Sequence, residues 1–114
     1  MEDCIFCKIT KGELPSTKVY EDDKVLAFKD INPVTPVHVI LIPKKHIVSV
    51  NEITEDDTDL IAHIFMTIKK IAKDLDIAKS GYRVITNAGK DAGQTVPHLH
   101  FHILGKKDLG EKLI

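Results

Sequence analysis

The residues with the clearest chemical potential are three histidines near the C-terminus, which alternate with apolar residues from His98 to Ile103. In a strand, this alternation places the imidazoles of His98, His100 and His102 on one face and the apolar side chains in the core. In a helix the same spacing scatters the imidazoles around the cylinder. The pattern therefore predicts a strand over 97–104, with three ring nitrogens in a row along one edge of a sheet.

The spacing also limits the chemistry of the three rings. Same-face neighbours on a strand lie about 6.6 Å apart, whereas zinc–nitrogen bonds are about 2.0–2.1 Å long. All three rings reach one ion only if the strand bends, so a division of labour is favoured. Neutral His100 can attack phosphorus while a charged neighbour stabilises the phosphoryl oxygens. A metal-dependent hydrolase that uses the run itself as ligands stays open.

The first half of the chain contains the elements that must position these rings. A short helix is expected over Cys4–Thr10, because Gly12 and Pro15 stop it. Two runs rich in β-branched and aromatic residues, Thr17–Glu21 and Lys24–Lys29, predict a hairpin. The two prolines of Asn32–Pro36 make a connector, and Val37–Ile42 is the next strand.

The second half contains the long helix and the remaining strands. Thr54 can cap a helix whose apolar residues recur at helical spacing as far as about Ile77. Tyr82–Thr86 is a strand, and a Gly-rich loop over Asn87–Val96 leads to the histidine run. The sequence thus predicts an α+β fold: an antiparallel sheet of about five strands, one long helix and a short N-terminal helix, in a single domain over residues 1–114.

Composition argues against several classes of partner. The formal net charge is −1, from 16 basic and 17 acidic side chains, and proteins that bind nucleic acid or membranes usually carry excess Lys and Arg. No apolar run is long enough to span a bilayer, and the start lacks the pattern of a signal peptide. We therefore expect no nucleic-acid partner, no membrane partner and a cytoplasmic location.

Cys4 and Cys7 form a Cys-x-x-Cys pair, which is half of a tetrahedral zinc site. In a cytoplasmic protein the pair indicates thiols or metal ligands in preference to a disulfide. Two buried thiols that pack as small apolar side chains are the alternative.

Taken together, the motifs resemble the histidine triad (HIT) family, in its branch of nucleotide-binding proteins that hydrolyse nucleoside phosphoramidates. The family pattern His-x-His-x-His followed by apolar residues matches the run that starts at His98. Further matching blocks occur in family order along nearly the whole chain: Cys4–Ile9, Ala27–Pro33, Pro36–Val39, Ile42–His46 and Asn87–Val96.

The resemblance implies a role for each matching residue. His100 becomes the nucleophile that forms a nucleotidyl-histidine intermediate, with His38 beside it, His102 on the phosphate and His98 as the remaining triad histidine. A second group would bind the nucleotide: Asn87, Gly93, Gln94 and Thr95 around the phosphate, Asp30 on the ribose, and Ile5, Phe6, Ile9 and Ile31 around the base.

The resemblance also implies a metal and a second subunit. In several microbial relatives the cysteine pair is completed by two histidines, and His46 and His98 match those positions, so a structural zinc held by Cys4, Cys7, His46 and His98 is expected. The family forms homodimers whose two sheets join into one. Certain animal members carry an aromatic C-terminal tail, but this chain has no Trp and ends in Gly110–Ile114.

The function implied is therefore a purine nucleoside phosphoramidate hydrolase that releases a nucleoside 5′-monophosphate. Two alternatives stay open. One is hydrolysis of dinucleoside polyphosphates, although relatives with that activity carry a longer chain after the triad. The other is a nucleotide-binding regulatory module in which turnover is incidental.

Overall fold

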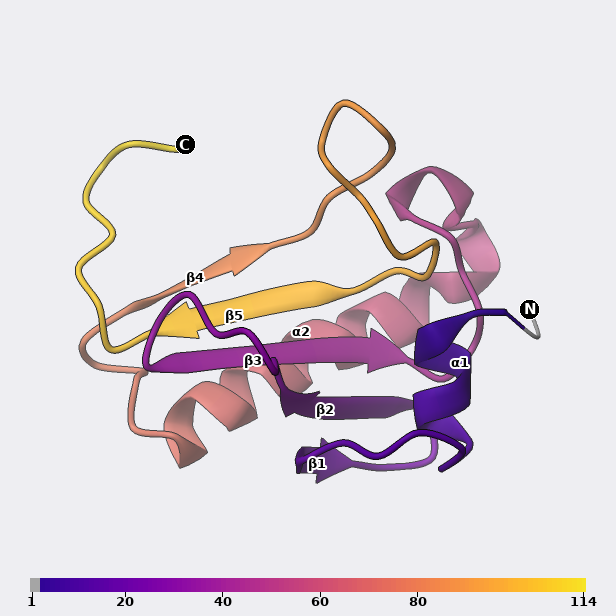
Figure 1. The fold of residues 1–114 in the computed structure, drawn as a ribbon, viewed down its shortest axis with the longest axis horizontal. Coiled ribbons are helices and arrows are strands. Elements are labelled where there is room, and N and C mark those ends of the chain that lie inside the picture. Colours follow the sequence, from indigo (N-terminus) through magenta and orange to yellow (C-terminus); the bar gives the residue numbers. More distant parts are fainter. Residues whose placement is uncertain (1–2) are drawn as a thin grey trace.

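A computed structural model describes residues 3–114, and its strands form one antiparallel sheet in the order β1-β2-β3-β5-β4 (Figure 1). The strands are β1 (Lys18–Glu21), β2 (Val25–Lys29), β3 (Val37–Pro43), β4 (Tyr82–Ile85) and β5 (Phe101–Gly105). The helices are α1 (Ile5–Thr10) and α2 (Thr58–Asp74), with 3-10 turns η1 (Val50–Glu52) and η2 (Glu55–Asp57) before α2. The predicted fold class is confirmed.

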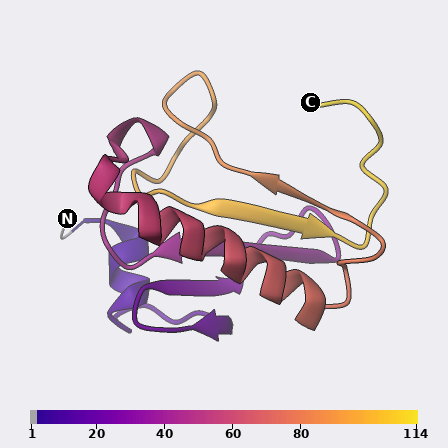
Figure 2. The same cartoon turned by 180° about the vertical axis from the view of Figure 1, so that it is seen from behind.

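The two helices cover opposite faces of the sheet, and α2 crosses the face seen in Figure 2. Residues of α2 at helical spacing, Ile64, Ile68 and Ile71, are buried against this face. Burial of this apolar stripe drives the packing, because each large aliphatic side chain contributes about 1.5–3 kcal/mol when removed from water.

A smaller core lies on the other face, under α1. Its buried residues come from the helix and from β2 and β3: Cys4, Phe6, Cys7, Ile9, Leu26, Phe28, Ile40 and Ile42. The β2 strand is therefore apolar at four successive positions, buried on both sides. This second core is what places α1 beside the histidines.

The predicted alternation around the histidines is confirmed, since Leu99, Phe101 and Ile103 all belong to the α2 core. The predicted length and place of the strand are wrong. β5 begins at Phe101 instead of Pro97, and it lies between β3 and β4 instead of at an edge. Pro97 has no N–H to donate, and the N–H of Leu99 donates to the carbonyl of Ile47 at 2.6 Å, outside the strand ladder.

The start of the long helix differs slightly from the prediction. Thr54 caps the 3-10 turn η2, where its hydroxyl and the Asp57 carboxylate form a capping box, and the α-helix proper follows from Thr58. The hairpin prediction is confirmed, and Asp22 closes it by accepting the N–H groups of Lys24 and Val25. Among residues 3–114, no helix is both long and apolar enough to cross a membrane.

Candidate active site

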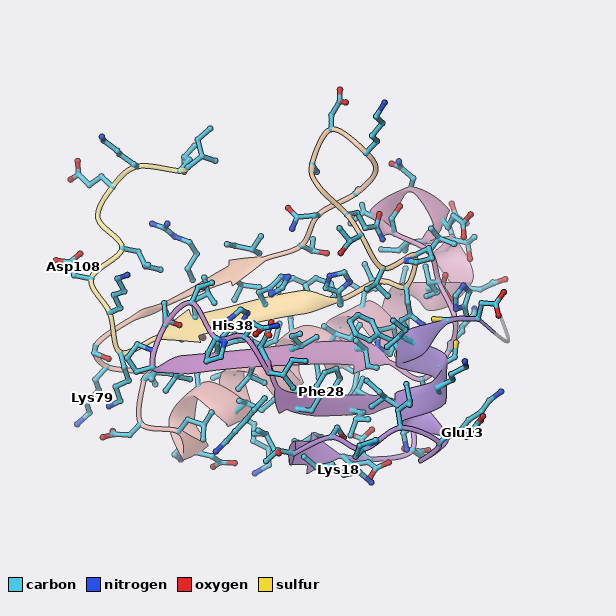
Figure 3. All side chains as sticks on the ribbon, viewed as in Figure 1. Glu13, Lys18, Phe28, His38, Lys79 and Asp108 are labelled. Atoms are coloured by element: carbon cyan, nitrogen blue, oxygen red, sulfur yellow. The ribbon has the colours of Figure 1, made fainter. Side chains whose placement is uncertain are left out.

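Three histidines meet on the face of the sheet that carries α1. His38 comes from β3, His102 from β5, and His100 from the extended segment just before β5. The ring centroid of His102 lies 5.1 Å from that of His38 and 5.2 Å from that of His100. Figure 3 labels His38 and also Phe28, which belongs to the core under α1.

The His100 ring is held in one tautomer. Its Nδ1 lies 2.7 Å from the main-chain carbonyl of His98, and because a carbonyl only accepts, Nδ1 carries the hydrogen. In the neutral ring, Nε2 is then a bare lone pair. Phe6 packs edge-on against the ring with centroids 5.1 Å apart. This arrangement leaves a fixed imidazole nitrogen that can act as a nucleophile.

A chain of hydrogen bonds sets the tautomers of the other two rings. The main-chain N–H of Val34 donates to His38 Nδ1 at 3.1 Å, so neutral His38 carries its hydrogen on Nε2. His38 Nε2 lies 2.9 Å from His102 Nδ1 and 3.3 Å from an Asp30 carboxylate oxygen. If His38 donates to His102, the hydrogen of His102 stands on Nε2, where it can be donated to a ligand.

Burial favours the neutral forms of His38 and His102, which this series of hydrogen bonds requires. It lowers the pKa of His38, and the nearby Asp30 carboxylate opposes that shift only in part. It also lowers the pKa of His102, with further lowering by His100 and His38 and an opposing effect of Asp30. Both rings are therefore neutral at neutral pH.

A second cluster forms where α1 meets the ends of β3 and the histidine run. It contains Cys4, Cys7, His46 and His98, whose potential ligand atoms all lie within 4.8 Å of one another. His46 Nδ1 lies 3.1 Å from Cys7 Sγ, and His98 Nδ1 lies 3.4 Å from Cys4 Sγ. The sequence prediction of this residue set is confirmed as a group that could hold a metal ion.

The donor set fits a metal such as zinc. His98 Nε2 donates to the carbonyl of Pro43 at 2.8 Å, so the Nδ1 that faces both cysteines is a lone pair, as a metal ligand requires. Burial, followed by the neighbouring Cys4, raises the pKa of Cys7. A divalent cation would offset that cost of forming the thiolate.

The triad residues thus divide between two sites. The His98 ring is fully buried and faces the cysteines, while only its carbonyl reaches His100. Within the described part of the chain, the triad rings do not form a group that could share one metal ion. Asp30, His38 and His102 do form such a group, and the hydrogen bonds above account for their closeness.

The loop predicted to surround a phosphate is largely bonded to itself. The main-chain N–H of Gly93 donates to Lys90 and that of Gln94 to Gly89, at 3.0 and 3.1 Å. Thr95 is exposed and Asn87 half-buried, and across residues 3–114 no hydrogen bond engages either side chain. Both side chains therefore have donors left for a ligand.

The residues predicted to surround a base differ in exposure. Ile31 is 91% exposed and Ile5 is 51% exposed, whereas Phe6 and Ile9 are buried in the core under α1. Large apolar side chains exposed to this degree are available to a ligand. Asp30, beside Ile31, has one carboxylate oxygen bonded to the N–H of Asn32 at 2.8 Å.

Sequence reasoning missed three contacts around these groups. The Val34 N–H is a main-chain donor and leaves no sequence signal. The Thr86 hydroxyl donates to the His100 carbonyl at 2.7 Å, and a threonine at the end of a strand is too common to predict this. His63 Nε2 lies 2.7 Å from an Asp22 carboxylate oxygen and ties α2 to the β1–β2 turn, and the two residues are far apart in the sequence.

Comparison with known proteins agrees with this geometry. A model of the HIT domain matches residues 11–109. An uncharacterized HIT-like protein from Synechocystis is 50% identical over 104 residues, which cover 91% of this chain and 90% of that protein. A solved HIT family hydrolase from Clostridium thermocellum is 55% identical, with a TM-score of 0.97 and coverage of 100% of this chain and 99% of that chain.

A histidine triad protein from Clostridium difficile is 54% identical, with a TM-score of 0.94 and coverage of 98% of this chain and 97% of that chain. Sequence and fold therefore agree over almost the whole molecule. The chain belongs to the HIT family.

Proposed function

We propose that the protein hydrolyses purine nucleoside 5′-phosphoramidates through a nucleotidyl-histidine intermediate on His100. The observation that carries the proposal is the bond from His100 Nδ1 to the His98 carbonyl, because it leaves Nε2 as an oriented lone pair. Similarity to a HIT family hydrolase supports the class of reaction. A single catalytic domain over residues 1–114, working in the cytoplasm, is part of the proposal.

In the first half-reaction, His100 Nε2 attacks the α-phosphorus and the bond from phosphorus to the amine nitrogen breaks. The leaving amine takes up a proton. Charge on the phosphoryl oxygens is met by the Nε2–H of His102, whose tautomer depends on the donor chain from Val34 through His38. Thr95 and Asn87 supply the further donors.

In the second half-reaction, water attacks the same phosphorus and the bond to His100 breaks. The water gives up a proton, which balances the one taken by the amine, and the nucleoside monophosphate leaves. Asp30 accepts hydrogen bonds from the ribose hydroxyls, since a carboxylate suits a vicinal diol. Ile5 and Ile31 contribute the exposed apolar surface for the base.

A single-turnover experiment tests the proposal directly. Wild type in excess over adenosine 5′-phosphoramidate, quenched in base before the turnover is complete, is expected to carry an adenylyl group, which mass spectrometry of peptides maps to His100. The adduct should be lost in acid. His100→Ala should form no adduct and lose at least about 10⁴-fold in kcat. An unmodified wild type with an unaffected variant would reject this function.

The same assay separates the alternatives. Turnover of diadenosine triphosphate well above that of the phosphoramidate would indicate a dinucleoside polyphosphate hydrolase. Tight binding of AMP without turnover of either substrate would indicate a regulatory module.

We further propose that Cys4, Cys7, His46 and His98 hold a structural zinc ion. The support is the donor set of two thiols and two ring nitrogens, which matches the preference of zinc. Metal analysis of protein purified without chelators should give about one zinc per chain, and Cys7→Ser should give none. Turnover that persists in chelator would discard a catalytic metal, including one on Asp30, His38 and His102.

We also propose a homodimer in which the sheets of two copies join along β4. The β4 strand is an edge of the sheet, with β5 as its neighbour. Exposed apolar residues lie beside that edge or on α2: Tyr82 at 37%, Phe65 at 51% and Met66 at 62%. An edge strand near apolar surface favours pairing with another chain. Sedimentation equilibrium should give twice the chain mass.

A further inference from the structure

The side-chain amide of Gln94 bonds to the main chain of the protein at three points. Its Oε1 accepts the N–H of Gly89 at 2.9 Å. Its Nε2 donates to the carbonyl of Val48 at 2.7 Å and to that of Val96 at 3.1 Å. Gln94 is only half-buried, so its amide could bond to water instead. It bonds to the main chain nevertheless.

These bonds occupy the N–H donors that the amide could otherwise direct at a phosphate. A glutamine amide has two N–H donors, and both already point at carbonyl groups. The main-chain N–H of Gln94 is also engaged, with the carbonyl of Gly89 at 3.1 Å. What remains free on the side chain is acceptor capacity on Oε1, which repels an anion. The side chain therefore has no donor left for the substrate.

The three bonds join parts of the chain that are otherwise separate. Gly89 and Val96 stand near the two ends of the loop over residues 87–96, which rises beyond the end of β4 in Figure 1. Val48 belongs to the segment after β3. Its neighbour Ile47 accepts the N–H of Leu99 at 2.6 Å, just before His100. Gln94 and Leu99 thus bond the loop and the segment after it to the same two residues, Ile47 and Val48.

Closing the loop in advance has an energetic consequence. A loop that is flexible before binding must be ordered by the ligand, and the conformational entropy lost in that ordering weakens binding. Gly89 and Gly93 have φ of +85° and +79°, so the loop already contains the left-handed turns that its shape needs. The Gln94 amide links the ends of this preformed turn.

We propose that Gln94 is a positioning residue, which closes the loop and holds Thr95 and Asn87 in place for the phosphate, and that its side chain does not bind substrate. The role of the loop at the phosphate rests on the function proposed above. The closure of the loop by Gln94 does not, so the two can fail separately.

The test uses two variants and a control in the same loop. Gln94→Met keeps the length of the side chain without its hydrogen bonds, and Gln94→Glu turns the two donors into acceptors that face carbonyls. Asp91→Asn is the control, because Asp91 is exposed and lies at the tip of the loop. Unfolding midpoints should confirm that all three remain folded.

Amide hydrogen exchange in the ligand-free protein is the first readout. The N–H groups of Gly89 and Gln94 should exchange about tenfold faster in both Gln94 variants than in wild type and in Asp91→Asn. Unchanged protection would overturn the proposal. This readout involves no substrate and is decisive even if the wild type turns over no phosphoramidate, a result that rejects the proposed function alone.

Kinetics and binding give the second readout. Both Gln94 variants should lose about 10- to 100-fold in kcat on adenosine 5′-phosphoramidate, because Thr95 is misplaced relative to phosphorus. Their affinity for adenosine, which has no phosphate, should stay within about twofold of wild type. Weakened AMP binding with unchanged loop exchange would instead identify Gln94 as a phosphate contact and overturn the proposal.

Discussion

His98 connects two sites through different parts of one residue: its main-chain carbonyl accepts the Nδ1–H of His100 at 2.7 Å, and its own Nδ1 faces the sulfur of Cys4 at 3.4 Å. The ring is fixed from behind by the carbonyl of Pro43. The first histidine of the run therefore orients the ring of the second, while its own ring faces the cysteines. In this way the candidate metal site and the proposed nucleophile are held by the same residue.

Asp30→Asn is expected to move the acidic limb of the kcat profile to lower pH. Burial lowers the pKa of both His38 and His102, and the charge of Asp30 is the effect that opposes it in each case. Without that charge, both pKa values fall further. Protonation of either ring breaks the donor chain, so activity is present above the lowered pKa values and is lost as pH falls through them.

The measurement is kcat at saturating substrate from about pH 4.5 to 8, a range that brackets the ordinary histidine pKa. Saturation removes the effect of a weaker ribose contact, which appears in KM. Asp108→Asn, an exposed carboxylate in the C-terminal tail, should leave the profile unchanged. A limb that moves to higher pH would show that Asp30 does not act on these rings through its charge.

Thr86→Val should slow the reaction, and Thr86→Ser should restore it. The Thr86 hydroxyl donates to the carbonyl of His100, the proposed nucleophile, at 2.7 Å and so fixes its main chain from the end of β4. Valine has nearly the same shape but cannot donate, whereas serine keeps the hydroxyl. We expect kcat to fall about tenfold and the free energy of unfolding by about 1 kcal/mol in the valine variant.

Single-turnover rates and urea unfolding of the three proteins check this prediction. KM should change little, because Thr86 bonds to the protein. Equal kcat in the valine and serine variants would mean that the hydroxyl has no positioning role.

The parts of the fold that rest on local periodicity could be predicted from the sequence. The alternation from Leu99 to Ile103 identified which side chains enter the core, and the helical spacing identified the buried side of α2. The start of β5 could not be predicted in this way, because the N–H of Leu99 bonds to Ile47, far away in the sequence. Strand ends depend on such distant partners.

In the candidate site, too, some features could be predicted from the sequence and others depend on distant partners. The resemblance to a family identified which residues gather, including His46 and His98 beside the cysteines. It did not predict that Gln94 bonds to Val48, or that His63 pairs with Asp22, because each contact joins elements that meet only in the folded chain. Hydrogen-bond capacity, counted donor by donor, is what separates a binding residue from a positioning one.

Gly105→Ala should destabilise the protein through a clash with Ile77. A Cβ at position 105 would lie 2.9 Å from Ile77 Cγ2 and 3.0 Å from its Cδ1, and Ile77 is fully buried. Gly105 pairs with Val37 and with Tyr82, so the main chain is held on both sides and cannot move away. We expect a loss of about 1–3 kcal/mol in the free energy of unfolding.

A double-mutant cycle with Ile77→Ala checks the cause. The alanine removes both clashing atoms, so the double variant should be more stable than the sum of the single losses predicts, by about 1 kcal/mol or more. Urea unfolding of the four proteins gives the coupling energy. Strict additivity would place the strain at another neighbour of Gly105.

Removal of the proposed zinc ion should weaken the fold but leave turnover in place. The cluster links α1, the end of β3 and the histidine run, so loss of the ion removes a cross-link between three segments. We expect a chelator to lower the free energy of unfolding by about 2 kcal/mol or more. Turnover should continue at temperatures below the new unfolding midpoint, because His100 Nδ1 still donates to the His98 carbonyl and the proposed chemistry on phosphorus uses no cluster atom.

Cys7→Ser, which is expected to bind no metal, is the control and should show no further change in chelator. Immediate and complete loss of turnover in folded, chelated wild type would instead assign the metal a part in the reaction.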